Sequence, residues 1–148
     1  MLRISTKSTY AIRALLHITK RMNEKAIKLQ EISEGENIPL PYLEQIFSKL
    51  KKAGIIQALR GPQGGVLLSK NPDKISMVDI VTALEGPINP VICSIPDKRT
   101  PDCHDIEGCQ SRAICCELDG AIIKILKKHT IASLSNNPFS SEELVPAD

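Results

Sequence analysis

All five cysteines of this 148-residue chain lie within 24 consecutive residues. Prolines and a glycine interrupt the stretch that holds the first three cysteines, which indicates a loop. A loop can bring several thiolates to one point, and thiolates are ligands of iron–sulfur clusters and zinc. The first three follow the pattern C-x9-C-x5-C and two more come after it: Cys93, Cys103, Cys109, Cys115 and Cys116.

Residue chemistry allows three interpretations of these thiols. Free cysteines are often buried in a core, and this interpretation suits Cys115 and Cys116 because they fall in a segment with helical spacing. A zinc site would take His104 or Cys115 as its fourth ligand, but the C-x2-C pairs typical of structural zinc are absent from the sequence. The third interpretation is an iron–sulfur cluster held by the first three cysteines.

Charge is divided unevenly along the chain. Residues 1–80 carry 13 Lys and Arg against 7 Asp and Glu, a net charge of +6, whereas residues 81–148 carry 6 against 10, a net charge of −4. A basic half suits a polyanion such as DNA, although a solvated surface would look the same. The 42% of apolar residues suffice for one domain with a modest core.

Targeting signals are not evident in the sequence. No apolar run approaches the length of a membrane span. Arg13 and His17 interrupt the apolar residues near the N-terminus, which argues against a secretory signal. We therefore expect a cytoplasmic protein that does not bind a membrane, and a cytoplasmic location disfavours paired disulfides.

The apolar residues of the N-terminal half recur at helical spacing. A stripe through Ala11, Leu15 and Ile18 predicts a first amphipathic helix. A second, shorter helix is expected around residues 29–32, with Gly35 as its end.

The following segment predicts a third helix and a hairpin. In NIPLPYLEQIFSKLKKAG four apolar residues share one face, Pro41 suits the first turn and Gly54 ends the helix. The runs IIQAL and VLLS flank RGPQGG, which predicts a β-hairpin whose tip carries Arg60. This order of elements is typical of a winged helix-turn-helix, in which the third helix enters the major groove. The alternative is a small α+β domain with a solvated basic face.

Two more helices are expected after the hairpin. Ser76 and Asp79 form a capping box at the start of a helix that Gly86 closes. A long helix with one wide apolar stripe follows Cys109, and on so small a domain such a stripe most simply packs against its copy in a dimer. The stripe contains Ile114, Leu118, Ala121 and Ile125.

The expected fold class is therefore mainly α with a small β-hairpin, a winged helix-turn-helix domain plus a long dimerisation helix. The predicted organisation is a DNA-binding domain over 1–86, a cysteine-containing loop over 87–110, a dimerisation helix over 111–134 and a tail over 135–148. No nucleophile–base arrangement is evident, and RGPQGG lacks the Lys-Ser/Thr of a phosphate-binding loop, so enzyme activity is not expected.

The run YLEQIFSKLKKAGIIQALRGPQGGVLLS, with STYAIRALL upstream, resembles the Rrf2 family of bacterial winged-helix regulators. The iron–sulfur cluster regulator and nitric-oxide-sensitive regulator branches are nearest, and the resemblance covers roughly residues 1–132. It implies a homodimeric, sequence-specific transcriptional regulator that binds a near-palindromic, double-stranded DNA operator. Cluster-binding members carry three cysteines in the loop before the dimerisation helix, which implies Cys93, Cys103 and Cys109 as metal ligands.

Carried over residue by residue, the resemblance also implies a set of DNA contacts. Side chains of the third helix approach bases, the hairpin tip lies in the wing, and the N-terminal positions lie near phosphates. Glu44 resembles a selectivity filter that penalises DNA unable to donate to its carboxylate. The chain has Pro39 and Pro41 where the iron–sulfur cluster regulator has serines, so the operator sequence does not carry over. The implied residues are Thr6, Lys7, Pro41, Tyr42, Glu44, Gln45, Arg60 and Gly61.

The resemblance favours an iron–sulfur cluster over the other interpretations of the thiols, with 2Fe–2S ranked ahead of 4Fe–4S. The fourth ligand is unknown, because the position of the family's histidine is Arg112 here and that of its N-terminal acidic residue is Thr9. The alternative functions are a metal-free thiol-redox or zinc-binding regulator of the same fold, and a metal-storage or scaffold protein with a vestigial wing. Local ligand candidates are His104, Asp105, Glu107, Cys115 and Cys116.

Overall fold

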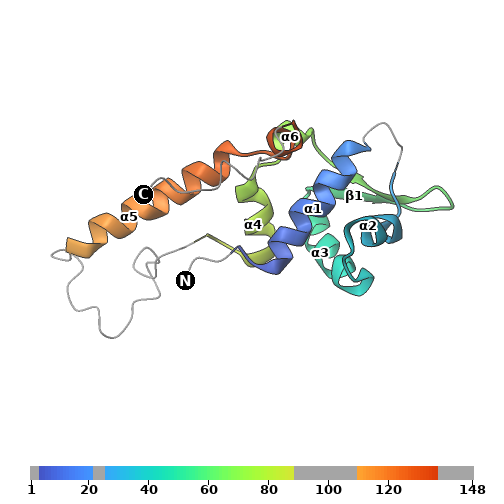
Figure 1. Cartoon of the computed structure of the whole chain (residues 1–148), viewed down its shortest axis with the longest axis horizontal. Helices are drawn as coiled ribbons and strands as arrows, with labels where there is room; N and C mark the ends of the chain where they lie inside the picture. Colours follow the sequence, from blue (N-terminus) through green and yellow to red (C-terminus); the bar gives the residue numbers. More distant parts are fainter. Residues whose placement is uncertain (1–3, 22–25, 89–109, 137–148) are drawn as a thin grey trace.

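The computed structural model describes residues 4–21, 26–88 and 110–136, and Figure 1 shows the arrangement of its elements. The predicted class, mainly α with one small hairpin, is confirmed. Among the described residues no helix combines the length and apolar character needed to cross a membrane. The elements are α1 (Thr6–Lys20), α2 (Leu29–Glu36), α3 (Leu40–Lys52), β1 (Ile56–Leu59), β2 (Gly65–Leu68), a 3-10 turn η1 (Pro72–Lys74), α4 (Met77–Glu85), α5 (Gln110–Lys128) and α6 (Ile131–Asn136).

The core lies among α1, α2, α3 and α4, which each bury apolar side chains, α2 through Ile32 alone. Burial of these stripes supplies the main driving force for packing the helices together, at roughly 25 cal/mol per Å² of apolar surface removed from water. Pro41 lies in the first turn of α3, where its missing amide donor leaves no intrahelical bond unmade. Gly54, with φ of 68°, follows the helix as predicted. The most buried members include Ala11, Leu15, Ile32, Leu43, Ile46, Leu50 and Ile80.

The end of α2 differs from the prediction. The helix passes through Gly35 and ends at Glu36, and Asn37 takes the left-handed conformation that terminates it, with φ of 53° and ψ of 51°. Gly35 has another role, because a Cβ placed there would lie 2.6 Å from Cε1 of His17 on α1. The glycine therefore permits a close approach of α2 to α1 and does not serve as a cap.

The hairpin is anchored by a third segment at the start of β2, beside the turn. β1 and β2 are antiparallel, with Ile56 opposite Leu68. Ile27, from the connection between α1 and α2, forms a bridge with Val66, exchanging backbone hydrogen bonds of 3.0 and 2.8 Å. Gly65 makes this bridge possible, since a Cβ there would lie 2.6 Å from the carbonyl carbon of Ile27. The wing thus holds a fixed position relative to α1 and α2.

The range 111–134, assigned to the dimerisation helix, contains α5, which ends at Lys128, and most of the short helix α6. α5 projects from the winged domain and its C-terminal end lies beside α4, and α6 follows from that end and packs against α1 and η1 (Figure 1). The chain turns between them where the Met77 amide donates to the His129 carbonyl at 2.9 Å and the Ile131 amide donates to the Ile75 carbonyl at 2.9 Å. The capping box predicted at the start of α4 is present, with Ser76 and Asp79 as its members.

Candidate nucleic-acid interface

The first turns of α3 expose polar side chains on the face opposite the core. Pro41, Glu44 and Gln45 are exposed, whereas Leu43 between them is fully buried. This alternation follows from helical periodicity, since the apolar residues that fix α3 to the core leave the other side of the helix uncovered. The arrangement presents a carboxylate, an amide and a proline ring to solvent.

An aromatic contact brings the start of α1 to the start of α3. The rings of Tyr10 and Tyr42 meet edge to face, with centroids 5.8 Å apart and planes at 87°, a geometry that aromatic pairs prefer. Thr6 lies one helical turn before Tyr10, and both Thr6 and Lys7 are exposed. The N-terminal positions expected near phosphates therefore lie beside the helix expected to read bases.

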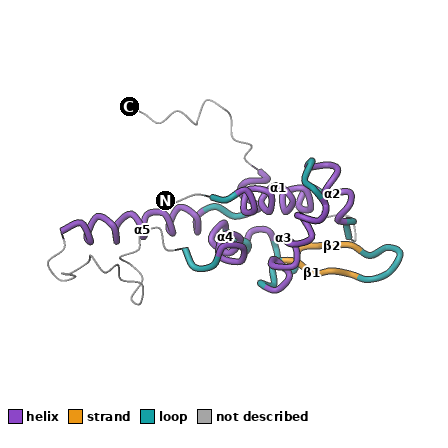
Figure 2. The backbone as a smooth tube through the Cα atoms, turned by 90° about the horizontal axis from the view of Figure 1, so that it is seen from below, coloured by secondary structure: helices purple, strands orange, loops and turns teal. Residues whose placement is uncertain are grey.

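The wing supplies a third exposed group. Arg60 and Gly61 follow β1 directly and are exposed, and the hairpin turn projects beyond α2 and α3 (Figure 2). Gly61 has φ of 107°, a value that side chains rarely adopt, and its carbonyl accepts from the Gly64 amide at 2.9 Å. The turn needs glycine for its backbone shape, and Arg60 is the one cation of RGPQGG.

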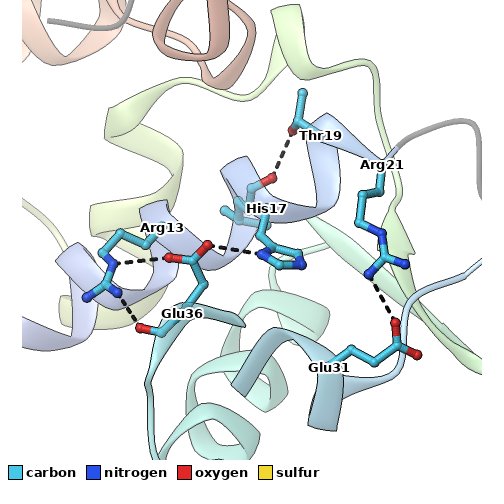
Figure 3. Close-up of polar contacts among 7 residues, drawn as sticks. Arg13, His17, Thr19, Arg21, Glu31 and Glu36 are labelled. Atoms are coloured by element: carbon cyan, nitrogen blue, oxygen red, sulfur yellow. Dashed lines mark hydrogen bonds and ion pairs between the residues drawn. The ribbon is translucent and has the colours of Figure 1, made fainter. Parts of the chain in front are cut away.

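A polar network joins α1 to the end of α2 (Figure 3). Glu36 accepts from Nε of Arg13 at 3.2 Å, and its other carboxylate oxygen lies 3.0 Å from Nδ1 of His17. Arg13 also donates to the Glu36 carbonyl, and an ion pair of 3.0 Å joins Arg21 to Glu31. Because Glu36 precedes the turn into α3, the network fixes the angle at which α3 leaves α2.

A second polar cluster joins the end of α4 to the start of α1. Glu85 accepts from the amide of Ser5 at 3.3 Å, from the hydroxyl of Ser5 at 2.7 Å and from the hydroxyl of Ser8. Burial acts to raise the pKa of Glu85, but these hydrogen bonds and the charge of Lys7 outweigh it, so the pKa lies below its ordinary value. On the other side of α4, Nζ of Lys49 donates to the Leu84 carbonyl at 2.9 Å.

Sequence reasoning missed both networks. It assigned no polar contact to Ser8, His17, Lys49 or Glu85. Their partners are 19 to 80 residues away in the chain, so no periodic pattern joins them. The one local signal was Ser5-x-x-Ser8 at the start of α1, which is typical of a helix N-cap, and Ser5 is that cap.

The predicted metal ligands Cys93, Cys103 and Cys109 lie outside the described residues, as do the candidates His104, Asp105 and Glu107. Within the described part of the chain, no group of three or more His, Cys, Asp and Glu side chains could hold a metal ion. The predicted donor set, the three thiols of C-x9-C-x5-C, stays a prediction, and thiolates are ligands that suit iron–sulfur chemistry.

Cys115 and Cys116 differ from each other on α5. Cys115 is half-buried, whereas Cys116 is exposed. The interpretation of Cys116 as a core cysteine is therefore wrong, because successive residues of a helix point about 100° apart and only the first of the two faces the protein. An exposed thiol is open to oxidation or ligation in a way that a buried one is not.

The apolar stripe of α5 divides into two faces. One side faces the chain itself, and its Leu126 packs against the core. The other side is uncovered, with Ile114, Leu118 and Ile125 at 63%, 51% and 59% exposure. Exposed aliphatic side chains gathered on one face of a helix often take part in an interaction. Half-buried members of the first side are Cys115, Ile122, Ile123 and Leu126.

The folded elements define a class, the winged-helix transcriptional regulators. A family model described as "Rrf2: Iron-dependent Transcriptional regulator" matches residues 4–137, and the chain belongs to the Rrf2 family. It is accordingly a transcriptional regulator with a DNA-binding fold and not an enzyme.

Named relatives agree with this assignment. The HTH-type transcriptional regulator IscR of Erwinia tasmaniensis is 35% identical over 147 residues, covering 99% of this chain and 85% of the relative. IscR of Serratia proteamaculans is 33% identical with the same coverage. The expected resemblance to the Rrf2 family, near its iron–sulfur cluster regulator branch, is therefore confirmed.

Solved structures show the same fold. CymR of B. subtilis, described as a global cysteine regulator, superposes with a TM-score of 0.75 and 32% identity, covering 92% of this chain and 98% of the other. IscR of T. potens gives a TM-score of 0.74 at 25% identity, covering 99% and 94%. An oxidized form of CymR from Staphylococcus aureus gives 0.71 at 26% identity, covering 94% and 100%.

Proposed function

We propose that the protein is a homodimeric, sequence-specific regulator whose operator binding is modulated by an iron–sulfur cluster. One observation supports the DNA-binding half of the proposal above the others, the Tyr10–Tyr42 contact. It brings the exposed groups of two helices to one place, where a single duplex can meet both. Family membership adds the expectation that this surface serves transcription.

In the proposed complex α3 enters the major groove. Glu44 and Gln45 present an acceptor and an amide to base edges, and Tyr42, with Pro41 beside it, lies at the groove wall. Thr6 and Lys7 contact phosphates, while Arg60 and Gly61 follow the backbone or reach the minor groove from the wing. Phosphate contacts set the register, and base contacts supply sequence preference.

The uncovered side of α5 supports the homodimer. A two-fold axis beside this helix would pair the stripe with itself and bury the same residues twice. Two copies of α3 would then face half-sites about 34 Å apart, one turn of DNA, on a near-palindromic operator.

Cys93, Cys103 and Cys109 would hold the cluster. Their thiolates suit iron, and the chain's relatives carry the name IscR. A bound cluster supplies a redox-active centre with a charge that changes with its oxidation state. We rank 2Fe–2S ahead of 4Fe–4S.

A second candidate is a metal-free thiol switch or a zinc-binding regulator of the same fold. The similarity to CymR, with an oxidized form among its structures, supports the thiol switch. So does Cys116, whose thiol is exposed. In that case the cysteines would change state by oxidation and no iron would be needed.

Anaerobic purification decides between the candidates. Absorption between roughly 320 and 460 nm with matched iron and sulfide is expected for a cluster, and Cys103→Ser should remove it. Affinity for an operator selected from random DNA is then measured for loaded and apo protein at one salt concentration. Equal affinity in both states would contradict regulation by the cluster, and a colourless protein without iron after reconstitution would leave the second candidate.

A further inference from the structure

The last residues of α4 contact both elements that carry the proposed DNA contacts. On one side the Leu84 carbonyl accepts from Lys49 of α3 at 2.9 Å. On the other side the carboxylate of Glu85, the next residue, accepts from Ser5 and Ser8 at the start of α1. Figure 1 shows the end of α4 beside the first turn of α1.

Both links join complementary groups at helix ends. The final carbonyls of a helix lack intrahelical partners and carry partial negative charge, which a lysine ammonium stabilises. The first amides of a helix carry partial positive charge, which a carboxylate such as that of Glu85 stabilises. Ser8 is fully buried, so its hydroxyl would lack a partner if Glu85 moved away.

These links share one short helix. α4 is nine residues long and is fixed in the core by Ile80 and Leu84, which are 0% and 4% exposed. A shift of its last turn would therefore change the contact with α3 and the contact with α1 together. In the sequence the chain passes from Glu85 to Cys93 within eight residues.

We infer that the end of α4 is a positioning element that transmits the state of the cysteine segment to α1 and α3. The inference rests on the proposed function, since it explains how ligation or oxidation of the cysteines would reach the DNA-binding surface. Through these links, Glu85 fixes the position of the first turn of α1, which carries Thr6 and Lys7, and Lys49 fixes the position of α3 relative to α4. Two conformations of the end of α4 would give the protein different operator affinities. Ligation or oxidation of the cysteines would shift the populations of these two conformations.

The test measures the ratio of operator affinities between cluster-loaded and apo protein. Glu85→Ala removes all three accepted hydrogen bonds, Glu85→Gln keeps one acceptor oxygen, and Asp73→Ala removes an exposed carboxylate elsewhere as the control. Lys49→Met removes the donor to Leu84, and Lys52→Met is its control, with the same charge lost one turn away on α3.

We expect a ratio of at least about fivefold in the unmodified protein, reduced to within about twofold of one in Glu85→Ala. Glu85→Gln should keep an intermediate ratio, and both controls should keep the full one. In the apo protein, amides in the first turn of α1 should exchange hydrogen faster in Glu85→Ala than in Asp73→Ala, a readout that needs neither cluster nor DNA.

Two results would overturn the inference. If Glu85→Ala and Lys49→Met keep the ratios of their controls, the end of α4 does not transmit the signal, and the proposed function stands without it. If cluster-loaded and apo forms of the unmodified protein bind the operator with equal affinity, the cysteine segment does not regulate DNA binding and the inference fails. If no operator is selected at all, the proposed function itself is wrong.

Discussion

The uncovered side of α5 gives a quantitative prediction for self-association. Ile125→Ala removes three carbons from a side chain that is 59% exposed in the single chain. At ~0.8 kcal/mol per buried CH₂, complete burial of the exposed part in a dimer is worth about 1.4 kcal/mol for each copy. A two-fold interface contains Ile125 twice, so the dimerisation free energy lost is ~2.8 kcal/mol. This corresponds to a roughly 100-fold larger dissociation constant of the dimer.

Sedimentation equilibrium over a range of protein concentrations measures this dissociation constant. Ile123→Ala is the matched control, since it removes the same atoms from the same helix about 200° around from Ile125. Alanine favours a helix more than isoleucine does, so neither variant should unwind α5. An equal change in the two dissociation constants, or none in either, would refute the assignment of this face to the dimer.

Three further predictions concern the winged domain. Glu36→Ala should lower the free energy of unfolding by about 1–3 kcal/mol in a denaturant titration, because it removes the carboxylate that accepts from Arg13 and contacts the half-buried ring of His17. An effect no larger than that of Glu34→Ala, whose carboxylate accepts from Gln30 in the same helix, would contradict this. Gly65→Ala should lower the melting temperature, since the added Cβ would meet the backbone of Ile27 across the bridge to β2. Gly120→Ala has open space around it and should raise the melting temperature by stabilising α5. A change of the same sign in both variants would be inconsistent with the bridge. The pKa of Glu85 is lowered in the folded state, so its stabilising contribution is present above the ordinary pKa of 4.5 and is lost as the pH falls through the folded pKa. The difference in unfolding free energy between the unmodified protein and Glu85→Gln should therefore shrink in acid. A difference that grows in acid would contradict the lowered pKa.

Local periodicity explains what the sequence could predict. Ala11 and Leu15, one turn apart, are both fully buried, and the turn residues around Arg60 lie in the hairpin tip. Spacing along one segment determines which residues share a face, so α1, α3 and the hairpin followed from it. The direct contact of individual side chains with DNA stays a prediction.

Contacts between distant segments could not be predicted in the same way. The carboxylate of Glu85 meets Ser5 across 80 residues, and a hydrogen bond between polar side chains leaves no repeat in the sequence. The division of α5 into two faces had a similar cause. Its apolar residues form one stripe by spacing, and only the position of the protein body decides that Leu126 is covered and Ile114 is not.

The misassigned end of α2 shows why a glycine alone is an ambiguous signal. A glycine permits a left-handed residue or a close approach, and Gly35 serves the second purpose against His17. The ring of His17 cannot swing away freely, because Glu36 holds its Nδ1 at 3.0 Å. The contacts of His17 with Gly35 and Glu36 thus fix the distance of α2 from α1, just before Asn37 turns the chain into α3. The orientation of the helix proposed to read DNA therefore depends on a contact made four to five residues before that helix begins.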